Sequence, residues 1–252
     1  MNEMKRMLSF VRRAIDDYEM IDDGDKIAVG VSGGKDSLTL LSVLSNLRRF
    51  YPKKFDLVAI TVDMGFPDMD YSPIQSFCQG EKIEYIKVKT DIAKIIFEVR
   101  QESNPCSLCA KMRRGALHAA AVDAGCNKVA LGHHFDDAVE TFMMNLFFEG
   151  RLGCFSPKSY LSNRKITLIR PMLYATERDV SYFTRRRELP IVTNVCPEDK
   201  ATERENMKKL LSELERTNKG LRHRIFHAMC KGEIDGFSYN GRYPAQAEIT
   251  ED

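Results

Sequence analysis

Apolar residues along the chain gather in short, nearly unbroken runs, separated by longer segments in which they recur every three or four positions. Unbroken apolar runs are typical of strands covered on both faces of a parallel sheet, and the longer spacing is typical of amphipathic helices. The alternation predicts an α/β fold with a doubly wound, mostly parallel five-stranded sheet. The expected strands are 26–30, 55–63, 83–88, 128–132 and 166–169.

Helical spacing continues well beyond the last predicted strand, which indicates a helical C-terminal extension. Residues 151–164 are basic and have the composition of a loop. We expect an N-terminal helix packed on the core (1–23), an α/β domain (24–195), C-terminal helices (196–236) and a flexible tail (237–252). The expected helices are 2–20, 72–80, 91–100, 107–125, 136–149, 176–188, 203–217 and 221–231, with a further apolar helix opening at 38.

The composition is that of an ordinary soluble globular protein, with 43% hydrophobic and 29% charged residues among 252. No apolar run approaches the roughly 18 residues that a membrane span needs. Charges interrupt the basic N-terminus before the core of a signal peptide could form. We therefore expect a cytoplasmic protein without membrane contact. The net charge of +2 neither requires nor excludes a nucleic-acid partner.

The loop Gly30-Val-Ser-Gly-Gly-Lys-Asp-Ser-Leu38 lies between a predicted strand and a predicted helix. Glycines allow a close approach of backbone to an anion, and the start of a helix favours negative charge. The common P-loop has Ser or Thr directly after its Lys, whereas Asp36 follows Lys35. The string instead resembles the PP-loop of ATP pyrophosphatases, which cleave ATP between the α- and β-phosphates. The simpler alternative is a glycine turn before a core helix.

The chain has seven cysteines, an odd number that suits a reducing compartment. Cys106 and Cys109 form a C-x-x-C pair, which zinc, iron–sulfur and dithiol redox sites all use. No second close pair is present, so a set of three ligands is as natural as four. The other five are isolated in sequence and fit small buried hydrophobes; they are Cys78, Cys126, Cys154, Cys196 and Cys230.

Together with the PP-loop, four further motifs resemble the tRNA 2-thiocytidine synthetase family (TtcA), iron–sulfur-dependent tRNA thiolases of the PP-loop superfamily. They occur in the family's order, within about residues 24 to 215. The chain departs from the family pattern after the last motif, where Pro-Glu-Asp follows. The motifs are Cys106-Ser-Leu-Cys109-Ala-Lys-Met-Arg-Arg-Gly115, Leu131-Gly-His-His-Phe-Asp-Asp137, Ile169-Arg-Pro171 and Leu189-Pro-Ile-Val-Thr-Asn-Val-Cys196.

The resemblance implies a 4Fe–4S cluster held by Cys106, Cys109 and Cys196, with ATP and Mg²⁺ in a neighbouring site. Three thiolates leave one iron without a protein ligand, so that this iron can carry sulfur. The alternative for Cys196 is a buried structural cysteine. The ATP-binding residues implied are Val31, Ser32, Gly33, Gly34, Lys35, Asp36, Ser37, Val62, Asp63, Met64, Gly132, His133 and Asp137.

The resemblance also assigns catalytic roles. Asp137 would be a catalytic or magnesium-orienting carboxylate, and Asp36 would be a second carboxylate near Mg²⁺. Lys35 would be a catalytic cation of the PP-loop. Arg113 takes the position of a catalytic cation in related thiolases. From the residues alone, paired His residues could bind zinc, and Asp136 or Asp137 could simply cap the following helix.

The implied reaction adenylates the C2 oxygen of a cytidine in the tRNA anticodon loop and replaces it with sulfur. The expected partners are tRNA and a sulfur donor, either a cysteine desulfurase or sulfide, and a homodimer is possible. Two alternatives remain open: a PP-loop ligase with zinc or no metal at the cysteines, and a non-catalytic nucleotide-binding module. Candidate RNA contacts are Lys111, Arg114, Arg151, Lys158, Arg185 and Arg186, with Arg164 and Arg187 nearby.

Overall fold

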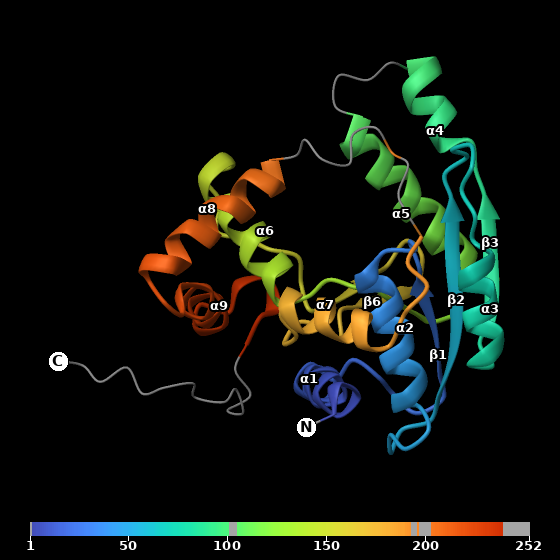
Figure 1. Cartoon of the computed structure of the whole chain (residues 1–252), viewed down its shortest axis with the longest axis horizontal. Coiled ribbons are helices and arrows are strands. Elements are labelled where there is room, and N and C mark those ends of the chain that lie inside the picture. Colours follow the sequence, from blue (N-terminus) through green and yellow to red (C-terminus); the bar gives the residue numbers. More distant parts are fainter. Residues whose placement is uncertain (1, 101–104, 193–195, 197–202, 239–252) are drawn as a thin grey trace.

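The sheet has six strands in the order β3-β2-β1-β4-β6-β5 in this computed structural model, which describes residues 2–100, 105–192, 196 and 203–238 (Figure 1). All neighbouring strands pair in parallel except β5, which is antiparallel to β6 at one edge. The strands are β1 (Asp25–Gly30), β2 (Phe55–Asp63), β3 (Glu84–Lys89), β4 (Lys128–Ala130), β5 (Lys158–Leu161) and β6 (Ile166–Ile169).

The α/β class and the mostly parallel sheet are confirmed, but the expected number of five strands is wrong. The additional strand is β5, which lies within the stretch 151–164 that we expected to be a loop. Its four residues alternate between exposed and half-buried positions. A strand at the sheet edge needs no continuous apolar run, because only one of its faces contacts the core.

Helices occupy nearly the expected positions, with ends that shift by a few residues. The segment 91–100 is not one α-helix, because a short α-helical turn passes into a π-helix at Ile95. The helices are α1 (Glu3–Asp17), α2 (Lys35–Leu47), α3 (Ser72–Gly80), α4 (Ile92–Lys94), η1 (Ile95–Arg100), α5 (Pro105–Asp123), α6 (Phe135–Phe148), α7 (Glu177–Arg186), α8 (Glu203–Thr217), α9 (Leu221–Lys231) and η2 (Ile234–Gly236).

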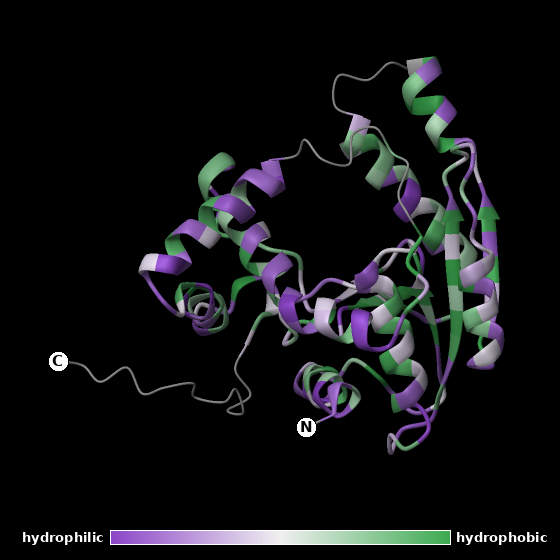
Figure 2. Cartoon of the chain, in the orientation of Figure 1, coloured by the Kyte–Doolittle hydropathy of each residue, from purple (hydrophilic) through white to green (hydrophobic). Residues whose placement is uncertain are grey.

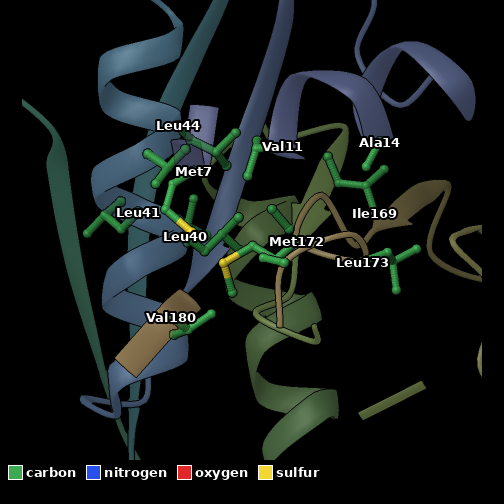
Figure 3. Packing of buried hydrophobic residues seen from close by; sticks show 14 of the residues in the cluster. Met7, Val11, Ala14, Leu40, Leu41, Leu44, Ile169, Met172, Leu173 and Val180 are labelled. Carbon is green, nitrogen blue, oxygen red and sulfur yellow. The ribbon is translucent and has the colours of Figure 1, made fainter. Parts of the chain in front are cut away.

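Two apolar layers cover the faces of the sheet, because successive residues of a strand point to opposite faces. Ile27 and Val29 of β1 belong to the larger layer, and Ala28 between them belongs to the smaller one. The larger layer packs the sheet against α1, α2 and α7 (Figure 3). Leu117 of α5 contributes to the smaller layer. Figure 2 shows β2 as largely green, whereas the helices carry both colours.

The C-terminal helices α8 and α9 pack on α6 and share the larger core. The rings of Phe135 and Phe226 lie 4.9 Å apart, and those of Phe226 and Phe237 lie 5.5 Å apart. Phe237, where we expected the flexible tail to begin, is therefore buried. The rest of that expected tail, from residue 239, lies outside the described residues. No helix in the described ranges is long and apolar enough to cross a membrane.

A buried lysine fixes the amino-terminal edge of the sheet. Lys128 opens β4 and is only 4% exposed. Its Nζ lies 2.7 Å from Asp25 Oδ2 of β1 and 2.8 Å from Asp22 Oδ2, and donates to the carbonyl of Met20 at 2.9 Å. Burial of a charge is costly unless it is paired and hydrogen-bonded, and Lys128 is both.

The opposite, carboxyl edge has the position of a ligand site. β1 pairs in parallel with both β2 and β4, so the chain winds outward from β1 in two directions. The loops after β1 and β4 therefore diverge at a topological switch point, which is where open α/β sheets bind ligands. The loop after β1 is the PP-loop, and the loop after β4 carries Gly132 and His133.

Candidate active site

The PP-loop closes on itself through the hydroxyl of Ser37. Ser37 Oγ donates to the carbonyl of Gly34 at 3.0 Å and accepts from the N–H of Ser32 at 3.2 Å. Within the described residues, Gly34 at the N-cap of α2 places no side chain over the helix end. The first N–H groups of α2 therefore face the carboxyl edge of the sheet, where a phosphate can accept from them.

Gly33 brings the PP-loop against the segment that leads to Cys196. Its φ is +89°, and a Cβ there would lie 2.9 Å from the Cβ of Val192. The N–H of Val192 donates to the carbonyl of Gly33 at 3.0 Å. Glycine is thus required at position 33 both for backbone conformation and for space. Val192 lies four positions before Cys196, so the phosphate loop and the third cysteine are joined by a short piece of chain.

Gly132 packs the loop after β4 directly onto the PP-loop. A Cβ at Gly132 would lie 3.1 Å from the backbone N of Ser37 and 3.1 Å from the backbone C of Asp36. The structure therefore brings these two predicted motifs together by backbone contact. His133 follows at once.

Lys35 is held at the mouth of the loop by two carboxylates. Its Nζ lies 3.0 Å from Asp36 Oδ1 and 3.5 Å from Oε1 of Glu177, the first residue of α7. Burial alone would lower the pKa of Lys35, but the attraction of Asp36 and Glu177 outweighs it, so the pKa is raised. Lys35 is therefore a fixed positive charge at neutral pH.

His134 links the two predicted carboxylates, Asp36 and Asp137. Its Nε2 lies 3.7 Å from Asp36 Oδ1, and its Nδ1 accepts from the N–H of Asp137 at 3.4 Å. The N–H of His134 donates to Asp137 Oδ2 at 2.9 Å, which completes a capping box. Asp137 therefore caps α6, as one of the two expected residues, but from position N3 of the box, and the N-cap itself is His134.

Two arginines from the C-terminal helices neutralise the acidic start of α6. Arg204 NH1 of α8 lies 3.5 Å from Asp137 Oδ1 and 3.6 Å from Glu140 Oε2. Arg222 NH1 of α9 lies 2.8 Å from Asp136 Oδ1 and 3.6 Å from Glu140 Oε1. Burial, together with the neighbouring Asp137, raises the pKa of Glu140 to about 7 against the attraction of both arginines.

His133 and Arg170 form a second polar group at the carboxyl edge, after β4 and β6. Their side chains flank Phe155: the imidazole ring lies 4.8 Å from its ring, and the Arg170 guanidinium carbon also lies 4.8 Å from it. Burial, aided by Arg170, lowers the pKa of His133 to about 4. Within the described residues, His133 Nδ1 and Arg170 Nε are buried without a hydrogen-bond partner.

The three predicted cluster ligands are electrostatic neighbours. Burial raises the pKa of the Cys109 thiol, Arg113 acts in the opposite direction, and the thiols of Cys196 and Cys106 add to the rise. Cys106 is exposed, while Cys109 and Cys196 are half-buried. No three His, Cys, Asp or Glu side chains in the described ranges converge as they would around a single metal ion.

The other four cysteines fit the interpretation as small buried side chains with a structural role. Cys78, Cys126 and Cys230 are buried, and Cys154 is half-buried. Burial raises the pKa of Cys78, Cys154 and Cys230 to about 12, so these remain thiols at neutral pH. They pack as small apolar side chains.

The residues expected to meet the adenosine end β2, beside the PP-loop. Val31 continues β1 by donating its N–H to Ile60 of β2 at 2.8 Å. Further along β2, the carbonyl of Asp63 accepts from Thr90, and that of Met64 accepts from the N–H of Ala93 at 2.8 Å. Val62 precedes them on the same strand, so the group is placed by the sheet.

Arg113 is not brought to the PP-loop by any described contact; it is exposed on α5, where its charge acts on Cys109.

The candidate RNA contacts are exposed and spread over several elements. Three of them have local partners: Lys158 Nζ donates to the carbonyl of Glu19 at 2.6 Å, Arg151 NH2 lies 3.3 Å from Glu149, and Arg114 Nε donates to the carbonyl of Ala110 at 3.2 Å. Lys111 and Arg114 lie on α5, and Arg185 and Arg186 lie in the last turn of α7.

Sequence reasoning missed Glu177, Arg204, Lys208 and Arg222. Each lies on a charged amphipathic helix, where charge usually indicates a solvated face. One signal was available: Thr176 and Asp179 have the spacing of a capping box, which is formed here and places Glu177 in the first turn of α7.

Comparison with known proteins gives consistent results. The PP-loop domain family matches residues 5–232. The tRNA-cytidine(32) 2-sulfurtransferase of Geobacter sulfurreducens is 42% identical over 228 residues, 89% of each chain. That of Ralstonia pickettii is 38% identical over 255 residues, covering 98% of this chain and 81% of the relative.

One solved structure is similar across most of the chain. It is the U34-tRNA thiolase NcsA from Methanococcus maripaludis with its 4Fe–4S cluster, at a TM-score of 0.75 and 26% identity, covering 90% of this chain and 77% of that one. The close glycine contacts that shape the loop are consistent with the PP-loop domain that matches residues 5–232. The chain belongs to the PP-loop family, among the tRNA-cytidine(32) 2-sulfurtransferases.

Proposed function

We propose that this protein is an ATP-dependent tRNA sulfurtransferase that replaces the C2 oxygen of an anticodon-loop cytidine with sulfur. The relatives named above support the substrate class. The observation that carries the proposal is the contact of Gly33 with Val192, because it joins the phosphate loop to the segment of Cys196. Activation and sulfur delivery can then occur at one place.

The chemistry needs activation because a carbonyl oxygen is a poor leaving group. The C2 oxygen attacks the α-phosphorus of ATP, and pyrophosphate leaves. Sulfur at the oxidation level of sulfide then attacks C2, and the C–O bond breaks so that the oxygen departs as part of AMP. Lys35, the hydroxyls of Ser32 and Ser37, and the first N–H groups of α2 stabilise charge on the phosphates during the first step.

Asp36 and Asp137 would hold Mg²⁺, because carboxylate oxygens are preferred ligands of this ion. Both lie against the imidazole of His134, Asp36 near Nε2 and Asp137 near Nδ1. Arg204 and Lys35 neutralise part of their charge in the structure as described.

The cysteine set is proposed to hold a 4Fe–4S cluster, as the similar tRNA thiolase does. The thiols of Cys106 and Cys196 both act electrostatically on that of Cys109. Cys106, Cys109 and Cys196 would hold the cluster, and Arg113 favours the thiolate of Cys109. When bound, a three-cysteine cluster would supply an iron that is free to carry sulfur.

The exposed basic residues of α5 and α7 are proposed to contact tRNA phosphates, which predicts salt-dependent binding. The target base would be turned out of its loop to reach the site, as in other proteins that read single-stranded RNA. We further propose a cytoplasmic location, a homodimer, and a cysteine desulfurase or sulfide as the sulfur donor.

The test is anaerobic purification followed by incubation with tRNA, ATP, Mg²⁺ and sulfide. We expect iron and sulfide in the protein, release of AMP and pyrophosphate, and 2-thiocytidine in the tRNA by mass spectrometry. Cys196→Ala should abolish thiolation, whereas Cys126→Ala should retain it. Stoichiometric zinc without iron, or thiolation that survives Cys196→Ala, would contradict the proposal.

A further inference from the structure

A carboxylate of α7 bridges the catalytic lysine to a lysine of the C-terminal helices. Oε1 of Glu177 lies 2.7 Å from Lys208 Nζ of α8 and 3.5 Å from Lys35 Nζ of α2. The three side chains are each about one third exposed, so a ligand at the loop can reach them. The pKa of both lysines is raised despite burial, by Asp36 for Lys35 and by Glu177 for Lys208.

The bridge is held in position by the surrounding helices. Glu177 is fixed at the start of α7, because its N–H donates to Asp136 Oδ2 at 2.7 Å. Arg222 NH2 contacts the carbonyl of Lys208 at 3.4 Å and Ser212 Oγ at 3.1 Å, while its NH1 pairs with Asp136. One arginine therefore fixes the backbone that carries Lys208 relative to the carboxylate that positions Glu177.

We propose that Lys208 is a second phosphate-binding cation, which contacts the β- and γ-phosphates of ATP and the pyrophosphate product. An oxygen that accepts from two ammonium groups has the surroundings that a phosphate oxygen needs. In the structure, Oε1 of Glu177 occupies that position. On binding, phosphate oxygens replace Glu177 as the acceptor from Lys208, and Glu177 remains a positioning residue for Lys35.

This inference rests on the proposed use of ATP and extends it, because Lys208 of α8 adds a cation from outside the α/β domain. Lys208 lies on a helix that begins seven positions after Cys196. The C-terminal helices that follow Cys196 would thus also contribute to phosphate binding. Pyrophosphate has no adenosine, so its binding depends on such cations more than the binding of AMP does.

The test compares Lys208→Met with Lys209→Met, a matched change at the next, exposed position of α8. The three ligands are AMP, magnesium pyrophosphate and magnesium α,β-methylene-ATP, titrated calorimetrically. We expect Lys208→Met to weaken pyrophosphate and the ATP analogue about tenfold and AMP less than twofold. Lys209→Met should match the wild type for all three. Equal binding by both variants, or an equal loss of AMP binding, would overturn the proposal.

The variant Glu177→Gln tests whether the charge of Glu177 positions Lys35 or whether the side chain only supports the fold. We expect turnover to fall about tenfold because Lys35 is less well positioned, while the affinity for pyrophosphate stays or rises because a competing anion is gone. Glu177→Asp should recover part of the turnover. A parallel loss of turnover and of pyrophosphate affinity would contradict the role of Glu177. If the wild type binds the ATP analogue but tRNA is never thiolated, the proposed function fails, and the comparison of Lys208→Met with Lys209→Met still decides the role of Lys208.

Discussion

The N–H of Val192 donates to the carbonyl of Gly33 at 3.0 Å, and a Cβ at Gly33 would lie 2.9 Å from the Cβ of Val192. The phosphate loop is therefore shaped by a segment more than 150 residues away along the chain. This contact makes position 33 a sensitive place to test the connection between the loop and Cys196.

Gly33→Ala should weaken ATP binding by tenfold or more, because the new methyl group must displace Val192. Gly24→Ala is the matched control: its φ of +82° is similar, but its Cβ would meet nothing within 4 Å. Both changes place a non-glycine residue at positive φ and should cost about 1–3 kcal/mol of stability. Thermal unfolding and ATP titration separate the two effects. Equal ATP affinity in the two variants would show that the contact is not needed.

Arg222→Ala should destabilise the protein by about 3 kcal/mol or more, because it leaves the carboxylate of Asp136 buried without its partner. The two side chains are only 13% and 12% exposed, so solvent cannot replace the lost pairing. Arg224→Ala, on the exposed side of the same helix, should change stability by less than about 0.5 kcal/mol. Urea unfolding of both variants measures the difference. Similar midpoints would contradict a structural role for the Asp136 pair.

Glu140 should make stability depend on pH. Its pKa in the folded protein is raised from 4.5 to about 7, so its contribution is fully present below pH 4.5 and is lost as the pH rises to about 7. A shift of this size corresponds to about 3 kcal/mol. Glu140→Gln should therefore gain stability relative to the wild type between pH 5 and pH 7.5. Unfolding curves at both pH values test this; a difference that does not change with pH would be inconsistent with the raised pKa.

Thiol labelling should separate the cluster ligands from the structural cysteines. In protein freed of metal, iodoacetamide should modify the exposed Cys106 first, while the buried Cys78 and Cys230 stay unmodified because their pKa is about 12. After anaerobic reconstitution with iron and sulfide, Cys106, Cys109 and Cys196 should all be protected. Peptide mass spectrometry gives the extent at each site. Labelling of Cys196 in protein with a full cluster would remove it from the ligand set.

Most of the fold could be predicted because buried parallel strands and amphipathic helices leave strong apolar patterns. The strand β5 could not, since Lys158 and Tyr160 point outward at the sheet edge and only half of its positions meet the core. Its partner β6 was recognised from Ile166-Thr-Leu-Ile169, which is largely buried. Pairing with β6, rather than the local sequence, establishes β5.

The site was predictable only where its residues form local motifs. The PP-loop and the contact of Gly132 with it follow from strand-end positions, which sequence patterns do indicate. Lys208 and Arg222 gain their roles from helix packing, and no spacing in the sequence distinguishes them from solvated charges. For Glu177, the capping-box spacing of Thr176 and Asp179 indicates its place in the first turn of α7 but not its partners. For Arg113, motif position predicts a catalytic role that stays a prediction, and its described interaction is with Cys109.

The ion pairs of Lys128 lie at the amino edge of the sheet, across β4 from the loops that would carry the chemistry. The residues that stabilise the fold and the loops that would carry the chemistry therefore lie at opposite ends of the same short strands. Changes near Lys128 can tune how long the folded protein survives without touching substrate. A thermostable derivative with unaltered kinetics should accordingly be sought at that edge.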